Sequence, residues 1–371
     1  MQTTNDVRVG LVGKRATAFI AGFRSVPEVR VQAFCDIDPN VCKRVAAQYE
    51  IPAQYRDFAE LIATDLDVVV VATPMHLHVQ QSVTALQAGK HVLSEVTAAV
   101  SVEECYQLVE AVRESGRQYM LAENCCYTKE NLLVQALAKA GLFGEMYYAE
   151  GDYVHDCRHL HHDLDGNPTW RAAWQVGRNG GTYTTHALGP VLEWLGDHVV
   201  SVACLGTGRH TEPPTGMDNS VTLLCKTKRG ALVNLRNDMQ SPRPSGPTTH
   251  FSLQGTKGAY QSARRKGEPN LIWLEGRSPD RETWQDLAEY EAEFLPEPWR
   301  SLESQAVQAG HGGGDFFVAR DFALSILNGT PVSIDVYRAL DFTVPGLVSD
   351  QSIAQGGIPL PIPNFRDLPS V

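Results

Sequence analysis

The first third of the chain repeats apolar segments that are each followed by a helical pattern, and this alternation constrains the fold more than any other sequence feature. Residues 68–72 are apolar throughout, which is typical of a strand buried on both faces of a parallel sheet. Such strand–helix units form doubly wound sheets with right-handed crossovers. We therefore predict an α/β domain. Its expected strands cover residues 7–12, 29–34, 68–72, 91–93 and 119–122, and its expected helices cover residues 16–25, 41–49, 79–88 and 102–115.

After residue 123 the pattern changes, and most segments alternate apolar with polar side chains. This alternation, with turns such as Lys228-Arg229-Gly230, predicts a largely antiparallel open sheet. We therefore expect a first domain of residues 1–124 and a second, α+β domain of residues 125–371. The second domain is expected to hold strands at 146–154, 220–226, 231–236, 249–254 and 270–274, helices at 130–140 and 316–328, and loop-rich stretches at 155–179 and 241–248.

The charge of the chain excludes two classes of partner. Its 32 Lys and Arg against 43 Asp and Glu give a net charge of -11, which repels nucleic acid and anionic membrane surfaces. No apolar run approaches the roughly 20 residues of a membrane helix, and the first residues lack the pattern of a secretory leader. The eight cysteines show no C-x-x-C spacing, as in a reducing compartment. We expect a soluble, cytoplasmic, globular protein with neither nucleic-acid nor membrane partners.

A dinucleotide-binding turn is predicted between the first strand and its helix. In the register of G-x-G-x-x-G only Gly13 is a glycine, while Arg15 and Ala18 hold the other two places. The Arg15 guanidinium suits a phosphate. Asp36 ends the second strand 18 residues beyond Ala18, where a carboxylate bonds the ribose 2′-hydroxyl and repels a 2′-phosphate. These residues favour a Rossmann domain that binds NAD rather than NADP. The plainer alternatives are an ordinary turn at Gly13 and a helix cap at Asp36.

Two further motifs give a resemblance to a known family. Thr73-Pro74-x-x-x-His78 and the run from Ala88 to Glu95 resemble the Gfo/Idh/MocA oxidoreductases. In that family the second run ends Glu-Lys-Pro, and its lysine holds the sugar hydroxyl that is oxidised. Here the triplet is Glu95-Val96-Thr97, and valine can neither donate a hydrogen bond nor relay a proton. The sequence therefore departs from the usual dehydrogenase arrangement.

Several longer runs give a second resemblance. They include Glu123-Asn124-Cys125-Cys126-Tyr127, Tyr153-Val154-His155-Asp156, Tyr183-Thr184-Thr185-His186-Ala187-Leu188-Gly189-Pro190 and His311-Gly312-Gly313. These runs resemble the NAD-dependent glycoside hydrolases of this superfamily, such as the α-N-acetylgalactosaminidases and the sulfoquinovosidases. The resemblance implies a glycosidase that acts by transient oxidation at C3, elimination across C1 and C2, addition of water and re-reduction. It implies a small-molecule glycoside as substrate and NAD as a cofactor regenerated in place.

The resemblance also implies which side chains do the chemistry. Histidine and tyrosine are suitable proton carriers. His186 is the first choice for removing the C2 proton, Tyr183 and Tyr153 for the hydroxyl proton and the leaving group, and His155 for orientation or relay. From spacing alone, these rings are more often packing than catalysis. The predicted cofactor-binding residues are Gly13, Arg15, Ala18, Asp36, Thr73, Pro74, His78, Glu95 and Asn124.

The loop-rich stretch between the two Tyr/His motifs carries arginines and tryptophans. A guanidinium clamps an anionic group, and an indole stacks on a sugar ring. An acidic glycoside, such as a sulfoquinovoside or uronide, is therefore an alternative to an N-acetylhexosaminide, whereas surface ion pairing is the plainer reading of the arginines. For Glu95 and His311 a structural role stands beside the functional one. The predicted substrate-binding residues are Arg158, Arg171, Trp170, Trp174 and His311.

No metal site is predicted. His159, His161 and His162 lie close to acidic residues, but their spacing fits no tight metal template. Two other functions stay open: an NAD-dependent sugar or polyol dehydrogenase in which Tyr183 or His186 replaces the missing lysine, and a non-catalytic NAD-binding sensor. The family's open sheet face pairs between subunits, so the resemblance implies a homodimer or homotetramer.

Overall fold

The computed structural model describes residues 6–163, 165–175, 178–211, 217–244 and 246–368. These residues form two compact units. Unit 1 contains residues 1–127, 301–340 and 365–371, and unit 2 contains residues 128–300 and 341–364. The expected division at residue 124 treats the domains as consecutive, whereas the chain of unit 2 returns to unit 1. Parts of the expected loop-rich stretches, residues 164, 176–177 and 245, lie outside the described residues.

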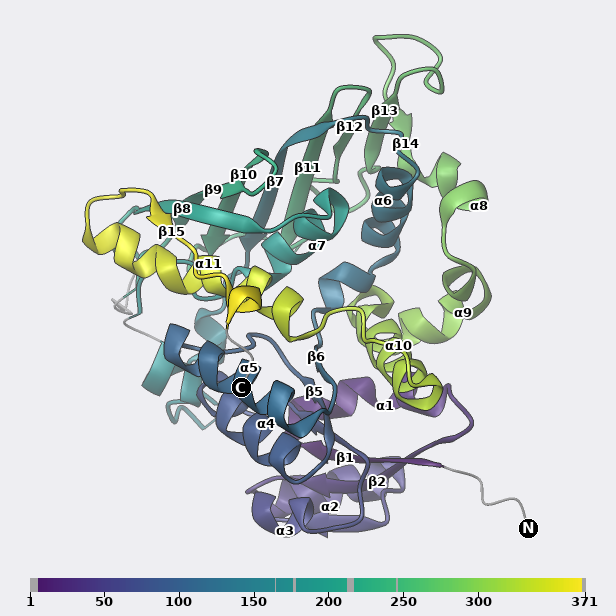
Figure 1. Cartoon of the computed structure of the whole chain (residues 1–371), viewed down its shortest axis with the longest axis vertical. Helices are drawn as coiled ribbons and strands as arrows, with labels where there is room; N and C mark the ends of the chain where they lie inside the picture. Colours follow the sequence, from purple (N-terminus) through teal and green to yellow (C-terminus); the bar gives the residue numbers. More distant parts are fainter. Residues whose placement is uncertain (1–5, 164, 176–177, 212–216, 245, 369–371) are drawn as a thin grey trace. The chain divides into compact units, whose positions relative to one another are not determined.

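Unit 1 is built on a six-stranded parallel sheet with the order β3-β2-β1-β4-β5-β6 (Figure 1). The four valines of β4 are fully buried, as a strand covered on both faces requires. The doubly wound fold is confirmed. Its strands are β1 (Val7–Val12), β2 (Val29–Cys35), β3 (Ala53–Tyr55), β4 (Val68–Val71), β5 (His91–Ser94) and β6 (Tyr119–Leu121), and its helices are α1 (Ile20–Arg24), α2 (Pro39–Tyr49), α3 (Phe58–Ile62), α4 (His78–Gln87), α5 (Val102–Ser115) and α10 (Gly314–Asn328).

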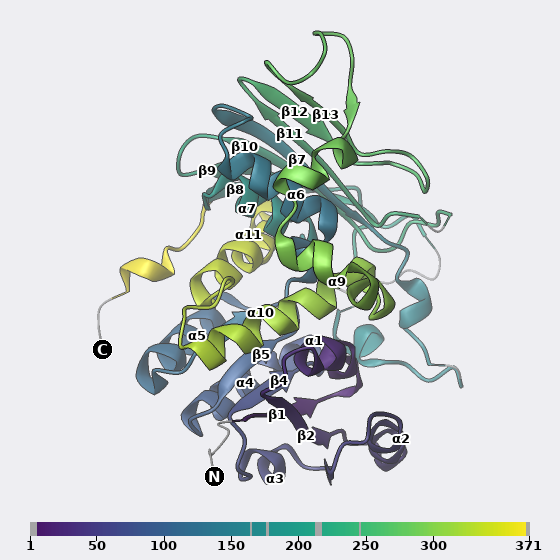
Figure 2. The ribbon, with the colours of Figure 1, turned by 90° about the vertical axis from the view of Figure 1, so that its right-hand side faces the viewer.

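Helix α10 is the late helix expected from the sequence, and it packs against α1 (Figure 2). A Cβ atom on Gly22 of α1 would lie 2.2 Å from the Phe316 carbonyl oxygen of α10, so the two helices approach backbone to backbone. The segment before α1 differs from expectation. It forms a 3₁₀ helix, η1 (Lys14–Phe19), and the α-helix begins only at Ile20. Helix α10 therefore adds to unit 1 a packed helix that comes from outside the first 127 residues of the chain.

Unit 2 is built on a nine-stranded sheet with the order β14-β13-β12-β11-β7-β10-β9-β8-β15. Of the pairs between described strands, only β7 and β10 run parallel, so the prediction of a largely antiparallel sheet is confirmed. The strands are β7 (Met146–Val154), β8 (Val199–Gly206), β9 (Val221–Thr227), β10 (Leu232–Asp238), β11 (Thr249–Gly255), β12 (Gly258–Gln261), β13 (Leu271–Leu274), β14 (Gln285–Asp286) and β15 (Leu360–Pro361).

Helix α7 (Thr185–Leu195) covers one face of this sheet, against β7, β10 and β11, and α6 (Lys129–Lys139) packs beside it. Two more helices, α8 (Glu291–Phe294) and α9 (Glu297–Gln308), follow the sheet strands, and α11 (Val336–Ala354) follows α10. Among the described helices, none combines the length and the apolar character needed to cross a bilayer.

Candidate active site

The predicted dinucleotide turn lies at the carboxyl end of β1. Gly13 has φ of 84°, and a Cβ atom there would lie 2.5 Å from the Ala72 carbonyl oxygen after β4, so only glycine fits. Its amide donates to the Cys35 carbonyl at the end of β2, at 2.8 Å. The Asp36 carboxylate accepts from the Lys14 amide at 3.1 Å. The turn thus sits at the edge of the sheet where doubly wound folds bind dinucleotides.

Arg15, which replaces the second glycine of the fingerprint, is held by two carboxylates of the protein. Its Nη1 and Nη2 each donate to Asp315 at 2.8 Å, and its Nε lies 2.5 Å from Glu95 Oε1. The guanidinium also lies over the Phe19 ring, 5.1 Å from its centroid. These contacts use the planar fork of the guanidinium, so the geometry favours a bracing role over the predicted phosphate contact.

Asp315, in the first turn of α10, is the centre of this network and is fully buried. Besides Arg15, it accepts from His311 Nδ1 at 2.6 Å and from Asn124 Nδ2 at 2.8 Å. Burial alone would raise the pKa of Asp315, but the hydrogen bonds from His311 and Arg15 hold it well below its usual range. A charged carboxylate therefore fixes three predicted site residues directly, and Glu95 through Arg15.

Sequence reasoning missed Asp315 because it is 300 residues from Arg15 in the chain. The available signal was its four-residue spacing from His311, which places both at one helix start. His311 itself was expected to bind substrate in the second domain. The structure places it in unit 1, on the buried carboxylate.

Several of the remaining predicted cofactor residues lie in or beside the loop after β4. Both ring nitrogens of the buried His78 lie within hydrogen-bonding distance of carbonyl oxygens, 2.8 Å from Thr73 O and 2.9 Å from Thr97 O. Thr73 Oγ1 is 2.6 Å from Gln81 Oε1. His78 therefore joins the loop at Thr73 to the loop at Thr97. Thr73 and Pro74 form the surface of the first of these loops. Ala18 is half-buried in η1.

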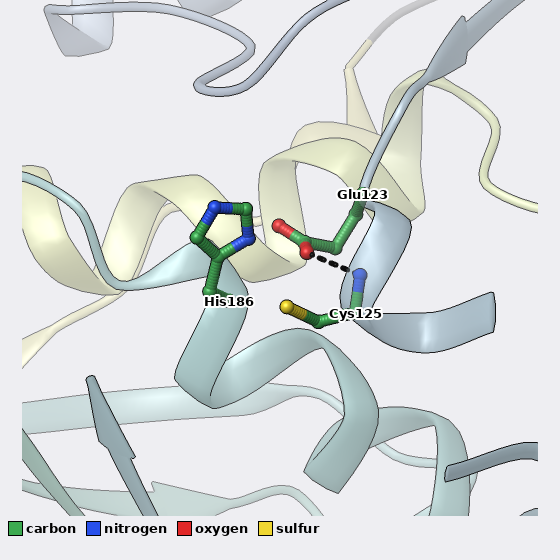
Figure 3. A group of neighbouring side chains, drawn as sticks. All are labelled: Glu123, Cys125 and His186. Atoms are coloured by element: carbon green, nitrogen blue, oxygen red, sulfur yellow. Dashed lines mark hydrogen bonds between the residues drawn. The ribbon is translucent and has the colours of Figure 1, made fainter. Parts of the chain in front are cut away.

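Glu123, which was given no role from the sequence, is a fully buried carboxylate two residues after the end of β6. Its Oε1 accepts from the Cys125 backbone amide at 3.1 Å (Figure 3). Figure 3 also draws His186, on the first turn of α7. A buried acid at the carboxyl end of a strand was detectable from sequence, because Glu123 follows a wholly apolar segment.

In unit 2 the four predicted catalytic rings form one cluster. The Tyr153 ring lies 5.4 Å from that of Tyr183 and 5.2 Å from that of His186, measured between centroids. Tyr183 and His186 are 5.1 Å apart. Tyr153 Oη and His155 Nδ1 are within hydrogen-bonding distance at 2.9 Å. The structure therefore brings together two phenols and two imidazoles from segments that are separate in sequence.

Close backbone packing positions this cluster. A Cβ atom on Gly151 would lie 2.3 Å from the Ala187 carbonyl oxygen, so the bare glycine lets α7 approach β7. The Gly181 amide donates to Ser349 Oγ at 2.8 Å, which ties the loop before α7 to α11. The Tyr183 carbonyl lies 3.4 Å from the side-chain nitrogen Nδ2 of Asn237 in β10. A strand end and a helix start thus meet at the rings.

The electrostatic surroundings keep His155 neutral. Burial, and then the neighbouring His159, Arg171 and His186, lower the pKa of His155 below its ordinary 6.5. A neutral imidazole accepts a proton at pH 7. The cluster can therefore accept and pass protons, as a proton-transfer site requires.

The predicted substrate arginines differ in their partners. Both Asp156 carboxylate oxygens accept from Arg158, at 2.8 and 2.7 Å, so this ion pair occupies the guanidinium. Arg171 stacks on Trp170, 4.6 Å from its ring centroid, and donates to the buried Gln175 at 3.1 Å. Of the two, Arg171 is the better placed to meet an anionic substrate.

Trp170 and Trp174 lie 6.5 Å apart, and Arg178 lies 3.9 Å from the Trp174 ring centroid. Arginines and indoles thus alternate along a stretch that includes one π-helical turn, Arg171–Gln175. Half-buried indoles beside guanidinium groups make a surface suited to a sugar ring.

The two parts of the chain match known families. Residues 7–123 match the oxidoreductase family with an NAD-binding Rossmann fold, and residues 127–203 and 216–367 match the C-terminal domain of glycosyl hydrolase 109. A glycosyl hydrolase family 109 protein of Streptomyces filamentosus is 34% identical over 395 residues, which cover 97% of this chain and 78% of that protein. One of Shewanella amazonensis is 32% identical over 400 residues, which cover 98% and 85%.

Solved structures share the fold over nearly the whole chain. Levoglucosan dehydrogenase in complex with NADH superposes with a TM-score of 0.80 at 20% identity, covering 97% of this chain and all of that one. An oxidoreductase domain protein from Kribbella flavida superposes with a TM-score of 0.82 at 17% identity, covering the same shares. At this identity the likeness concerns the fold.

Proposed function

Because the chain belongs to glycosyl hydrolase family 109, we propose that it is an NAD-dependent glycosidase that works without net oxidation. The proposed route is oxidation at C3 of the sugar, elimination across C1 and C2, addition of water and re-reduction. Direct hydrolysis needs two carboxylates flanking the glycosidic bond, and the proton carriers of unit 2 are instead rings.

NAD is the cofactor of this enzyme, and unit 1 fits it. We place the pyrophosphate at the turn of Gly13, which packs closely against the backbone after β4, and we assign Asp36 to the ribose hydroxyls. The surface of Thr73 and Pro74, together with Glu95 and Asn124, completes the proposed cofactor contacts. When bound, NAD supplies a reversible hydride acceptor for a sugar carbon.

The residues of unit 2 move the protons in this proposal. A ketone at C3 acidifies the neighbouring C2 hydrogen, and we assign its removal to His186. Tyr183 and Tyr153 take the hydroxyl proton and protonate the leaving group. His155, within hydrogen-bonding distance of Tyr153, orients that phenol and relays its proton.

The observation that carries the proposal is the single cluster of Tyr153, His155, Tyr183 and His186. Four proton carriers exceed what one hydride transfer needs, whereas oxidation, elimination and leaving-group departure each move a proton. Val96, at the place of the dehydrogenase lysine, also supports this assignment.

A sugar dehydrogenase is the second candidate. The whole-chain likeness to levoglucosan dehydrogenase favours it, and Tyr183 or His186 would then replace the missing lysine. This enzyme would accumulate NADH from a free sugar, whereas the glycosidase returns its hydride at each turnover.

One assay separates the two. Purified protein is incubated with aryl glycosides and with free sugars, and aglycone release and NADH absorbance are followed together. Aglycone release without NADH accumulation supports the glycosidase. Stoichiometric NADH from a free sugar supports the dehydrogenase, and neither signal across a broad panel supports the NAD-binding sensor.

Isotope exchange tests the elimination step itself. A glycoside carrying deuterium at C2 should lose it to solvent during turnover, because the route removes that hydrogen as a proton. Full retention of deuterium in the released sugar would contradict the mechanism even if aglycone is released.

The arginine beside the tryptophans favours an acidic sugar as substrate. Arg171 stacked on Trp170 suits an acidic sugar such as a uronide or sulfoquinovoside, and an N-acetylhexosaminide is the alternative. A cytoplasmic location and a homodimeric or homotetrameric assembly stay predictions.

A further inference from the structure

A cavity of about 350 Å³ opens beside His155, in unit 2. It lies at the carboxyl ends of the parallel strands β7 and β10, between the segment after β7 and the loop that joins β10 to β11. Its volume is in the range of small-molecule sites and suits a ring-sized group. The lining residues that matter here are His155, Asp156, His159, Arg243, Pro244 and Pro247.

The charges of this lining do not cancel. Asp156 is its acidic residue, and both carboxylate oxygens already accept from Arg158. Within the described part of the chain, Arg243 makes no hydrogen bond or ion pair. The cavity therefore presents an uncompensated guanidinium, although the chain as a whole carries a net charge of -11.

The two histidines add polar ring atoms at the same place. His159 Nδ1 donates to the Asp156 carbonyl at 3.0 Å, and His155 Nδ1 is engaged by Tyr153, so the Nε2 atom of each ring remains for another partner. The pKa of His155 is lowered first by burial and then by the neighbouring His159, Arg171 and His186, while Asp156 acts weakly in the opposite direction. Arg171 and Arg243 are the permanently positive neighbours of this ring, and their charge favours an anion there.

We propose that this cavity is a subsite for an anionic group of the glycoside, a carboxylate, sulfonate or phosphate, held by Arg243. The planar guanidinium bonds such groups through two parallel N–H donors, and the prolines give a rigid apolar wall for the attached ring. The proposal rests on the proposed function, because His155 belongs to both the cavity and the cluster. It also assigns to Arg243 the anion contact that the sequence had suggested for Arg158.

Binding of a matched pair of small probes tests the cavity without any turnover. Benzoate and benzamide have nearly the same shape and differ in charge, and calorimetry gives a Kd for each. We expect benzoate to bind about fivefold tighter, near the upper end for one exposed ion pair, and Arg243→Gln to abolish the difference. Arg281→Gln, at another exposed arginine, is the control, and Arg243→Lys should keep part of the preference.

Equal binding of the two probes to the wild type, or an unchanged preference in Arg243→Gln, would overturn the proposal. This readout stays valid if no glycoside is cleaved, an outcome that contradicts the proposed function but not the cavity.

Kinetics then locate the anionic group on the substrate. Three aryl glycosides are compared: one neutral, one with an acidic sugar and one with an acidic aglycone. Arg243→Gln should raise KM about fivefold for one acidic substrate and leave the neutral one unchanged. The affected substrate identifies which side of the scissile bond enters the cavity. Equal KM changes for all three would mean that Arg243 does not recognise charge.

Discussion

Asp315 in unit 1 is fully buried and His155 in unit 2 is half-buried, and their surroundings act on them in opposite ways. Hydrogen bonds from Arg15 and His311 overcome the effect of burial on Asp315 and keep it charged. At His155, burial and neighbouring positive charges act together and keep the ring neutral. The first group is fixed as an ion, whereas the second is left able to take up a proton.

This difference separates residues that hold a structure in place from residues that can exchange protons. Unit 1 uses directed ion pairs among Arg15, Glu95 and Asp315, with distances of 2.5 to 2.8 Å, to fix the residues expected around the cofactor. The cluster of Tyr153, His155, Tyr183 and His186 in unit 2 is built from ring contacts and a hydrogen bond between Tyr153 and His155, which suits groups that exchange protons. Variants of each region should therefore fail in different measurements.

The largest effect is expected from His186→Ala. Loss of a general base should lower the rate of aglycone release by about 10²- to 10⁴-fold, while the Kd for NAD, measured by fluorescence titration, stays within about twofold. His162→Ala, at an exposed loop histidine, is the control. A large change in NAD affinity would show that the division between the two regions is wrong.

Asp315→Asn should produce the reverse result. It removes the buried carboxylate that accepts from Arg15 and His311, while the half-buried Arg15 keeps its contact with Glu95, so we expect a loss of about 2 kcal/mol in the free energy of unfolding and weaker NAD binding. Urea denaturation measures the first and titration the second, with Glu114→Gln, at an exposed position of α5, as the control. Unchanged stability would mean that the network contributes nothing to unit 1.

The difference in unfolding free energy between the wild type and Asp315→Asn should depend on pH. The pKa of Asp315 in the folded chain lies below its ordinary 3.8, so its stabilising contribution is complete above about pH 4 and is lost as the pH falls further. The stability gap between wild type and Asp315→Asn should therefore be constant from pH 7 to pH 5 and narrow below pH 4. A gap that widens on acidification would contradict this assignment.

Gly151→Ala should disturb unit 2 alone. The added methyl group meets the Ala187 carbonyl, so α7 must move away from β7 at a cost of about 1–3 kcal/mol. Aglycone release should fall and NAD affinity should not. Gly246→Ala, where a Cβ atom meets nothing within 4 Å, is the stability control. Full activity in Gly151→Ala would show that this packing does not position the rings.

The smallest effect is a shift in titration. Arg171→Gln removes a positive neighbour of His155, so the pKa of that ring should rise toward its ordinary value. NMR titration of ring-labelled histidine measures it. Arg178→Gln, the other arginine stacked on an indole, is the control and should leave His155 unchanged. A lower pKa of His155 in Arg171→Gln would show that Arg171 does not lower the pKa of this ring in the wild type.

Local patterns predicted most of the elements. The expected helix over residues 102–115 coincides with α5, because a serine cap and a glycine after the last turn mark both ends. Helices α7 and α11 were both missed. Gly189-Pro190 lies within α7 and Pro345 lies within α11, and a proline normally indicates the end of a helix. The parallel pairing of β7 with β10 depends on contacts distant in sequence, which no local pattern encodes.

The site was predictable to a different degree in each unit. Tyr153, Tyr183 and His186 were found through motif resemblance, and the structure places their rings in contact, while their roles stay predictions. Asp315 and Arg243 were not found. Asp315 acts through Arg15, which is 300 residues away in the chain. Arg243 stands out only in the structure, where Arg158 is bonded to Asp156 and Arg243 has no such partner among the described residues.

The return of residues 301–340 to unit 1 has a consequence for how the protein is made. A ribosome delivers the strands β1 to β6 first, but Asp315 emerges only when more than four fifths of the chain has been translated. Until then Arg15 and Asn124 lack their anchor. Unit 1 therefore cannot complete this network during synthesis until residues 301–340 have been added, and a shortened chain that ends before residue 315 would lack the anchor of Arg15 and Asn124.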